Sequence, residues 1–315
     1  MTLRGQVATA GLFVAAMATV PAWIASDFLL SFFVMSLFFA QLGIAWNLLG
    51  GYGGQYSFGH AAFFGWGAYV TAMAQIHGGA DPWLMLPVSA VAGGGIGVAI
   101  GWLSFRYGLR GSYFALVTLA FAEVFRVLAN TFAFTGAGAG LLIKLAPGAA
   151  NLQFETKAGF FFFALALVAL GLAVSIWLEH SRFGARLVAV RENEDAAAAL
   201  GVDVLKTKLG AIGLSGALTG LAGAFYAQYF LYLDAGLAFG PAMSVEALLA
   251  AIVGGLGTVF GPVIGAFALQ IVAESARHVL GEAPGLALSL FGAILVAMVL
   301  FLPRGLMSLA RRRRA

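Results

Sequence analysis

The sequence consists largely of apolar runs of about 20 residues that are separated by short polar or glycine-rich stretches. A helix needs about 20 apolar residues to cross the roughly 30 Å hydrocarbon core of a bilayer. Ten runs approach or meet this length, with the eighth conspicuously short: 7–24, 28–49, 57–76, 83–104, 112–132, 158–178, 209–230, 243–254, 260–277 and 286–302. The pattern predicts an all-α, polytopic membrane protein with about ten transmembrane helices, in which residues 1–315 form a single transmembrane domain.

The composition supports a chain embedded in a lipid bilayer. It is 62% hydrophobic and 10% charged, whereas soluble domains are about half apolar and a quarter charged. The absence of cysteine excludes disulfides, thiolate metal sites and cysteine nucleophiles. The net charge of +4 arises from arginines at helix ends and does not indicate a nucleic-acid partner. The first run is too long for a signal peptide and lacks a small-x-small cleavage site, so we expect a retained first span.

One stretch, residues 179–208, is too polar to lie in lipid. It contains ten of the thirty charged residues: Glu179, Arg182, Arg186, Arg191, Glu192, Glu194, Asp195, Asp203, Lys206 and Lys208. Lysine and arginine collect in cytoplasmic loops. If all ten runs cross and the amino terminus is cytoplasmic, thirteen of the 17 basic residues lie on the inner side. The sequence therefore predicts that both termini and this loop are cytoplasmic.

Within this loop, residues 194–201 are expected to form a short helix. Asn193 is a helix-capping residue, Glu194 and Asp195 suit the positive end of the helix dipole, and Gly201 can end the helix in the left-handed conformation. An isolated helix this short is unstable, so it is expected to dock on a partner through its small alanine face. The alternative is an ordinary helical turn in a solvated loop. The residues assigned to the docking segment are Arg191, Glu192, Asn193, Glu194, Asp195, Ala197, Ala198 and Gly201.

Glycine-rich segments interrupt the helical pattern at residues 50–55, 135–140 and 254–262. Irregular backbone at membrane depth persists where it is buried in protein or lines a wet cavity. The first and third segments are therefore candidate linings of a pathway, and tight turns between adjacent helices are the alternative. Their loosely shared pattern is compatible with two repeats. The candidate pathway residues are Asn47, Gly53, Gln55, Ser57, His60, Thr118, Glu246, Gly255 and Gly257.

Ionisable residues inside spans are costly and usually face the protein interior. Glu123 and Arg126 are three residues apart on one face of a predicted helix, where they can neutralise each other. We predict a structural ion pair, with direct substrate contact as the alternative. His60 is expected to be a hydrogen-bonded packing residue or, alternatively, part of a relay.

The sequence contains no arrangement of residues that supports catalysis. The four histidines lack the spacing of a metal site, so no metal or other cofactor is predicted. A phosphate-binding Gly-x-x-x-x-Gly-Lys-Ser/Thr motif is absent, so this chain is not expected to hydrolyse ATP. Energy for active transport would have to come from another protein or from an ion gradient.

Six segments occur in an order that is shared with one family of transport proteins. They are residues 47–69 (NLLGGYGGQYSFGHAAFFGWGAY), 110–126, 191–201, 215–224 (SGALTGLAGA), 254–262 and 302–306 (LPRGL). The chain thereby resembles the LivM-type permease subunit of branched-chain amino acid ABC importers. One departure is residues 135–141, TGAGAGL, where the family usually shows Thr-Gly-Gly-Pro/Ser-Asn-Gly.

The resemblance implies a multi-pass protein of the bacterial inner membrane that works with several partners. These are a second related permease subunit, two cytosolic ATPase subunits and a periplasmic solute-binding protein. It also implies that residues 194–201 form the coupling helix that sits in a groove of one ATPase. Branched-chain amino acids are the implied solutes, although family members also move urea, short amides or aromatic acids.

Two other classes of function remain as alternatives. An ion- or proton-coupled secondary carrier, or a passive channel, would use Glu123, Glu246 and His60 as a relay. An intramembrane enzyme would need paired catalytic groups, which the spans lack. Co-purification of ATPase subunits and a second permease from the native membrane discriminates the importer from both.

Overall fold

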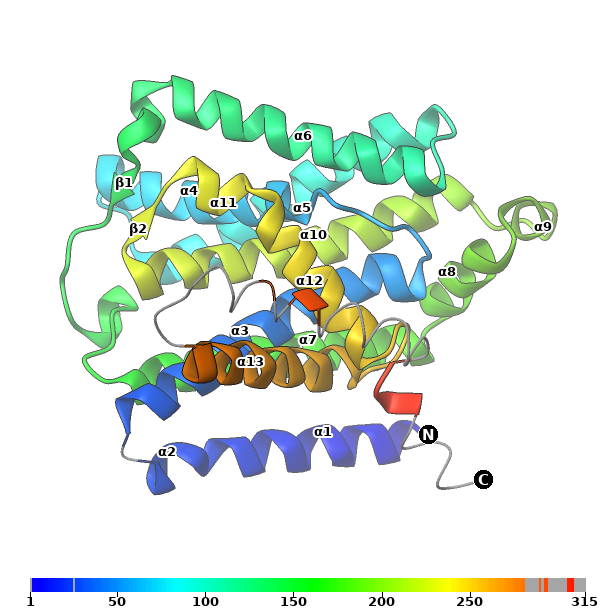
Figure 1. Cartoon of the computed structure of the whole chain (residues 1–315). Coiled ribbons are helices and arrows are strands. Elements are labelled where there is room, and N and C mark those ends of the chain that lie inside the picture. Colours follow the sequence, from blue (N-terminus) through cyan, green and yellow to red (C-terminus); the bar gives the residue numbers. More distant parts are fainter. Residues whose placement is uncertain (1, 25, 281–288, 290–291, 294–304, 309–315) are drawn as a thin grey trace.

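The protein is a bundle of long helices that run along a common axis (Figure 1). The computed structural model describes residues 2–24, 26–280, 289, 292–293 and 305–308. The α-helices are α1 (Leu3–Ala18), α2 (Val20–Trp23), α3 (Asp27–Asn47), α4 (His60–Gly78), α5 (Pro82–Arg106), α6 (Gly111–Thr131), α7 (Lys157–His180), α8 (Arg182–Glu192), α9 (Glu194–Ala199), α10 (Val204–Phe230), α11 (Ala235–Phe239), α12 (Pro241–Gly254) and α13 (Gly261–Leu280).

Shorter elements complete the described part of the chain. A π-helix, η1 (Leu48–Tyr52), continues α3, and the 3-10 turns are η2 (Ala133–Thr135), η3 (Ala137–Ala139) and η4 (Ala149–Asn151). Strands β1 (Leu141–Leu142) and β2 (Tyr232–Leu233) pair antiparallel. They lie at the end of the bundle opposite α9 (Figure 1), and we refer to the two ends as the α9 end and the β end.

Seven described helical stretches are long and apolar enough to cross a membrane. They are Leu3–Trp23, Asp27–Tyr52, Pro82–Arg106, Gly111–Thr131, Lys157–His180, Val204–Phe230 and Ala235–Gly254. α4 and α13 have 19 and 20 residues but fall outside this set, and the predicted span 286–302 lies largely outside the described residues. The structure thus shows a multi-pass, helical protein and does not confirm the count of ten.

α4 is less apolar than its neighbours because it lies inside the bundle. Its first half is almost continuously buried, and it packs against α5 and α10. A helix that is covered by other helices can carry polar and small residues that a lipid-facing helix cannot. The predicted eighth span is short because a helix is interrupted at Gly240. α11 and α12, on either side of this residue, together form the apolar stretch.

Glycines allow α5 and α10 to approach closely. A Cβ atom on Gly93 would lie 2.9 Å from the Cα atom of Gly220, and one on Gly97 would lie 2.9 Å from the carbonyl oxygen of Ile212. Small residues four apart at helix contacts are typical of membrane bundles, where close backbone packing replaces the hydrophobic effect as the source of association. These contacts fix the position of α5 against α10.

The amino terminus lies at the α9 end (Figure 1). Gln6 donates its Nε2 hydrogen to the Oε1 atom of Glu179 at 2.9 Å, and its Oε1 atom lies 2.7 Å from Nε2 of His180. α1 is therefore attached to the end of α7 from which the central loop begins. The structure places the amino terminus and this loop at one end of the bundle, and their cytoplasmic location stays a prediction.

Candidate functional site at the α9 end

The charged stretch 179–208 folds into more helix than the sequence analysis predicted. α8 (Arg182–Glu192) precedes the short α9, and its first turn is capped by Ser181, whose hydroxyl accepts the backbone N–H of Gly184 at 3.0 Å. A serine before an amphipathic run is the local signal that could have revealed α8. Its buried side chains include Leu187 and Val190, which pack against the bundle.

Local signals set both ends of α9. The Oδ1 atom of Asn193 accepts the backbone N–H of Ala196 at 2.9 Å. At the other end Gly201 has a φ of +83°, and its N–H donates to the carbonyl of Ala198 at 2.9 Å, while that of Val202 donates to the carbonyl of Ala197 at 3.0 Å. This pair of bonds is the Schellman arrangement, which satisfies carbonyls that a helix end leaves free.

The alanine face of α9 is only partly available to a partner. Ala197 was predicted to belong to the docking face, but it is 2% exposed, because α9 packs on α8 and α10 and turns one side toward them. The opposite side is exposed and includes Asp195, Ala198, Ala199 and Leu200, with Leu200 84% exposed. We call these four residues the α9 outer surface.

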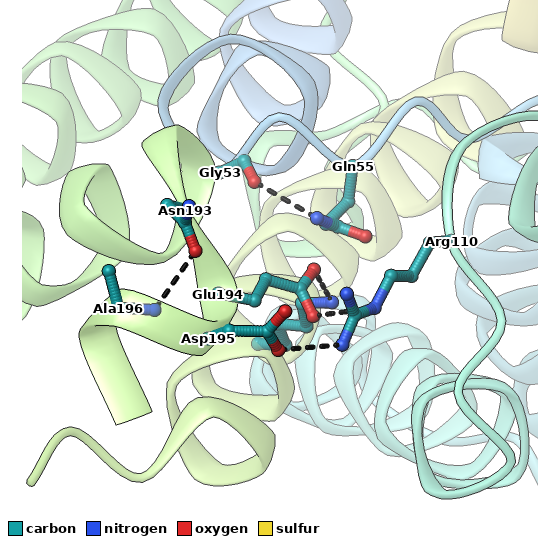
Figure 2. A network of polar contacts seen from close by, with 8 residues as sticks. Gly53, Gln55, Arg110, Asn193, Glu194, Asp195 and Ala196 are labelled. Atoms are coloured by element: carbon teal, nitrogen blue, oxygen red, sulfur yellow. Dashed lines mark hydrogen bonds and ion pairs between the residues drawn. The ribbon is translucent and has the colours of Figure 1, made fainter. Parts of the chain in front are cut away.

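An ionic network joins α9 to two other parts of the bundle (Figure 2). The ammonium group of Lys208 on α10 pairs with the carboxylate of Glu194, and its side chain is only 3% exposed. The Nε atom of Arg110 lies 3.0 Å from Oε2 of Glu194, and its Nη2 atom lies 3.6 Å from Asp195. Since Arg110 immediately precedes α6, the network links α9 to both α6 and α10.

Lys208 is another residue whose environment the sequence analysis predicted wrongly. It was assigned to a water-facing loop, whereas α10 begins at Val204 and buries it. Its ammonium also lies 5.1 Å from the centre of the Phe105 ring, a favourable arrangement for a cation. The signal for an early start of α10 was Asp203, whose carboxylate accepts the backbone N–H of Lys206 at 3.0 Å. This hydrogen bond lowers the pKa of Asp203.

The loop also contacts the two glycine-rich breaks, which meet each other. The Nη1 atom of Arg191 donates to the carbonyl of Gly51 at 3.0 Å. Asn47 accepts the N–H of Gly257 at 2.9 Å and donates to the carbonyl of Thr258 at 3.0 Å. One asparagine side chain thus bridges segments that are 210 residues apart in the sequence, and the side chain of Arg191 is attached to the first of them.

Further contacts fill the space around these breaks. A Cβ atom on Gly53 would lie 2.7 Å from the carbonyl of Leu49 and 3.2 Å from Leu187 on α8. The Nε2 atom of Gln55 donates to the carbonyl of Gly53 at 3.2 Å. At the second break, a Cβ atom on Gly305 would lie 2.6 Å from the Cα of Gly255. Both breaks are therefore packed among neighbouring segments.

Three predicted pathway residues lie together where α4 begins. The Oγ1 atom of Thr118 on α6 accepts the N–H of Phe58 at 3.2 Å, and Trp46 donates its indole N–H to the carbonyl of Ser57 at 2.8 Å. The Nε2 atom of His60 lies 2.8 Å from the hydroxyl of Ser215. These side chains hold the start of α4 against α3, α6 and α10.

Serines complete this cluster, and the sequence analysis did not identify them as functional. Ser215 donates its one hydroxyl hydrogen to the carbonyl of Ala45 at 2.6 Å, so the Nε2–H of His60 must be the donor in their bond. Ser244 on α12 accepts the backbone N–H of Ala61 at 2.8 Å. The contact supplies a hydrogen-bond acceptor that the first turn of a helix otherwise lacks.

The remaining predicted residues lie apart from these clusters. Glu246 is half-buried on α12. Glu123 and Arg126 form the expected ion pair, with Nε of Arg126 2.8 Å from the Glu123 carboxylate. Their side chains are 51% and 34% exposed, however, so the pair faces outward from this chain and not into its interior. The structural role predicted for the pair stays a prediction.

Two grooves on the bundle are apolar and contain none of the predicted pathway residues. One, of about 710 Å³, lies between α1 and α7, and another, of about 230 Å³, lies between α4, α6 and Phe239. Within the described residues no group of three or more His, Asp or Glu side chains is arranged to hold a metal. The polar clusters at the α9 end are therefore the strongest candidate functional site.

Comparison with known proteins gives the family of this chain. Residues 28–299 match the model of the branched-chain amino acid transport system permease component. This chain is a member of that family. The permease is 28% identical to the high-affinity branched-chain amino acid transport system permease protein LivM of Salmonella typhimurium and to that of Escherichia coli, over 88% of this chain and 69% of each relative. It is also 28% identical to a probable branched-chain amino acid transport permease protein LivH of Methanocaldococcus jannaschii, over 76% of this chain and 79% of the relative.

Proposed function

We propose that this permease is the transmembrane subunit of an ATP-driven importer that carries branched-chain amino acids or similar small solutes across the bacterial inner membrane into the cytoplasm. The family membership and the names of its relatives support the transport role and the class of solute. Its proposed partners are a second related permease, two cytosolic ATPase subunits and a periplasmic solute-binding protein. In this arrangement the α9 end is cytoplasmic.

The observation that carries the proposal is the construction of α9. Its outer surface is small and partly apolar, with Leu200 almost fully exposed. On the inner side, Glu194 is fixed by Lys208 and Arg110. A helix that is held rigidly to the bundle and presents a flat outer surface can transmit the movement of a protein docked on it.

The contacts suggest how that movement reaches the membrane helices. Displacement of α9 acts through Glu194 on α10 and on the start of α6. Displacement of α8 acts through Arg191 on Gly51, and Asn47 connects that segment to the second break. Nucleotide-driven closure of the ATPases would in this way move α3, α6, α10 and α13 together and open a passage for the solute.

Substitutions on the α9 outer surface test this function. In proteoliposomes that contain the complete complex and loaded binding protein, Ala198→Arg and Leu200→Arg should abolish ATP-driven uptake while the permease still inserts. We expect either loss of the ATPase subunits from the complex or loss of the stimulation of hydrolysis by binding protein. Leu145→Arg, at a position that is 68% exposed near the β end, is the control and should retain the ATPases.

A secondary carrier or channel would give the opposite result. Its loop has no ATPase to bind, so uptake would persist in Ala198→Arg and Leu200→Arg, would not need ATP, and would stop when the ion gradient is dissipated. That outcome would refute the importer function and the role of α9 together.

A further inference from the structure

The outward ion pair on α6 has a counterpart on another helix. Glu274 and Arg277 on α13 are also three residues apart, and their side chains pair at 3.1 Å. The sequence around each pair is Ala-Glu-x-x-Arg, at 122–126 and at 273–277. Glu123 is the thirteenth residue of α6 and Glu274 the fourteenth of α13. Because both helices begin at the α9 end, both pairs lie about 18–20 Å along their helices at 1.5 Å per residue, near the middle of a bilayer.

Both pairs are exposed on the surface of the single chain. The Glu123 and Arg277 side chains are 51% and 63% exposed. Arg126 does not extend toward the β end, because its guanidinium is bound to Glu123, one turn nearer the middle of the membrane. Charges at this depth are unfavourable in contact with lipid and usually face protein or water.

The peripheral helix on the other side of the bundle has a different surface. α1 and α6 occupy opposite edges of the molecule (Figure 1). The exposed side chains of α1 include Val7 and Leu12, 54% and 72% exposed, and the sequence has no ionisable residue between Arg4 and Asp27. α1 thus has the uncharged surface of a lipid-facing helix, whereas α6 exposes the Glu123–Arg126 pair.

α6 and α13 are the two borders of one continuous face. α6 packs against α11, α11 against α12, and α12 against α13. A two-fold axis along the membrane normal, placed at the centre of such a face, brings α6 of one chain opposite α13 of the other and keeps every residue at the same depth. Each Glu-x-x-Arg pair then meets the like pair of the second chain.

We propose that the face from α6 to α13 is the contact surface for a second permease chain of this fold, and that the two Glu-x-x-Arg pairs meet across the interface. Each guanidinium is folded back onto the carboxylate of its own pair, so all four charged groups lie at a similar depth. The Glu123 carboxylate can then bind the guanidinium of Arg277 on the second chain, while Arg126 binds its Glu274. This assigns the pair on α6 a structural role between subunits. The inference rests on the proposed function, in which a second permease is present.

Site-specific photo-cross-linking tests the assignment in the native membrane. A photoreactive amino acid replaces Leu116 on α6 or Ile271 on α13, which are 62% and 54% exposed, and Leu12 on α1 serves as the control. Cross-linked peptides are identified by mass spectrometry. We expect adducts of positions 116 and 271 with a permease chain of this family, with position 116 linked to the segment of that chain that corresponds to α13, and lipid adducts from position 12.

Removal of single charges gives a second test of the same surface. Glu123→Gln should leave the insertion of the single chain unchanged but reduce the recovery of the second permease severalfold during purification. Arg126→Gln should reduce the recovery in the same way, since either substitution removes a charge that the pair on the second chain binds. Recovery equal to the wild type in both variants would overturn the proposal.

The outcomes separate this inference from the proposed function. If a second permease and the ATPases co-purify but positions 116 and 271 label only lipid, or if position 12 labels the second permease instead, the surface is wrong and the importer function stands. If no second permease is present in the membrane, the proposed function fails and the inference fails with it.

Discussion

The buried contact between Lys208 and Glu194 allows a quantitative prediction. Glu194→Gln leaves the ammonium of Lys208, 3% exposed, without a carboxylate. Lys208→Met removes the buried charge, and Glu194 keeps the guanidinium of Arg110 at 3.0 Å. The two substitutions should therefore have unequal costs, although they break the same pair.

The structure sets the expected size of the difference. Removing one partner of a buried ion pair costs about 3–5 kcal/mol. Lys208 keeps the face of the Phe105 ring, which offsets about 1 kcal/mol. We therefore expect a loss of roughly 2–4 kcal/mol in the free energy of unfolding for Glu194→Gln, and of about 1 kcal/mol for Lys208→Met, where the remaining carboxylate is still paired. The double variant should resemble Lys208→Met, because the stranded charge is gone.

The free energies can be measured by reversible unfolding of the purified permease in mixed micelles with increasing SDS, followed by the fluorescence of its six tryptophans. Lys206→Met is the control, since this lysine is 85% exposed and pairs with Asp203 on the surface, and it should have little effect. Equal costs for Glu194→Gln and Lys208→Met, or a neutral Glu194→Gln, would refute the reasoning that a buried charge depends on α9.

Further predictions concern the glycines and the bridging asparagine. Gly257 has a φ of +64°, so Gly257→Leu should be strained as well as crowded. Gly257→Leu and Gly53→Leu, tested as separate variants, should each abolish uptake into proteoliposomes while the chain still inserts. Normal uptake in both variants would show that these segments tolerate bulky side chains. Asn47→Ala should lower stability by about 1–3 kcal/mol, because it leaves partly buried backbone groups of Gly257 and Thr258 unpaired, and unchanged unfolding in SDS would count against the bridge. Gly93→Leu should reduce the yield of folded protein, whereas Gly95→Leu, with no atom within 4 Å of its added Cβ, should not; similar yields would contradict the proposed packing of α5.

The sequence was sufficient for features that depend on short-range signals. Apolar runs long enough for a bilayer predicted most of the long helices, since the cost of unsatisfied backbone in lipid leaves few alternatives. The capping asparagine, the first-turn acids and Gly201 delimit α9 through contacts within four or five residues. The pairing of Glu123 with Arg126 is also local, because residues three apart are neighbours on a helix.

Tertiary packing decided what these elements face. The period of a helix places Ala197 and Ala198 on different sides, but only the positions of α8 and α10 determine that Ala197 is the buried one. The same holds for Glu123 and Arg126, which face outward because the bundle lies on the other side of α6. Asn47 meets Gly257 across 210 residues. Such contacts depend on how whole helices fit against each other, and no local pattern in the sequence specifies that fit.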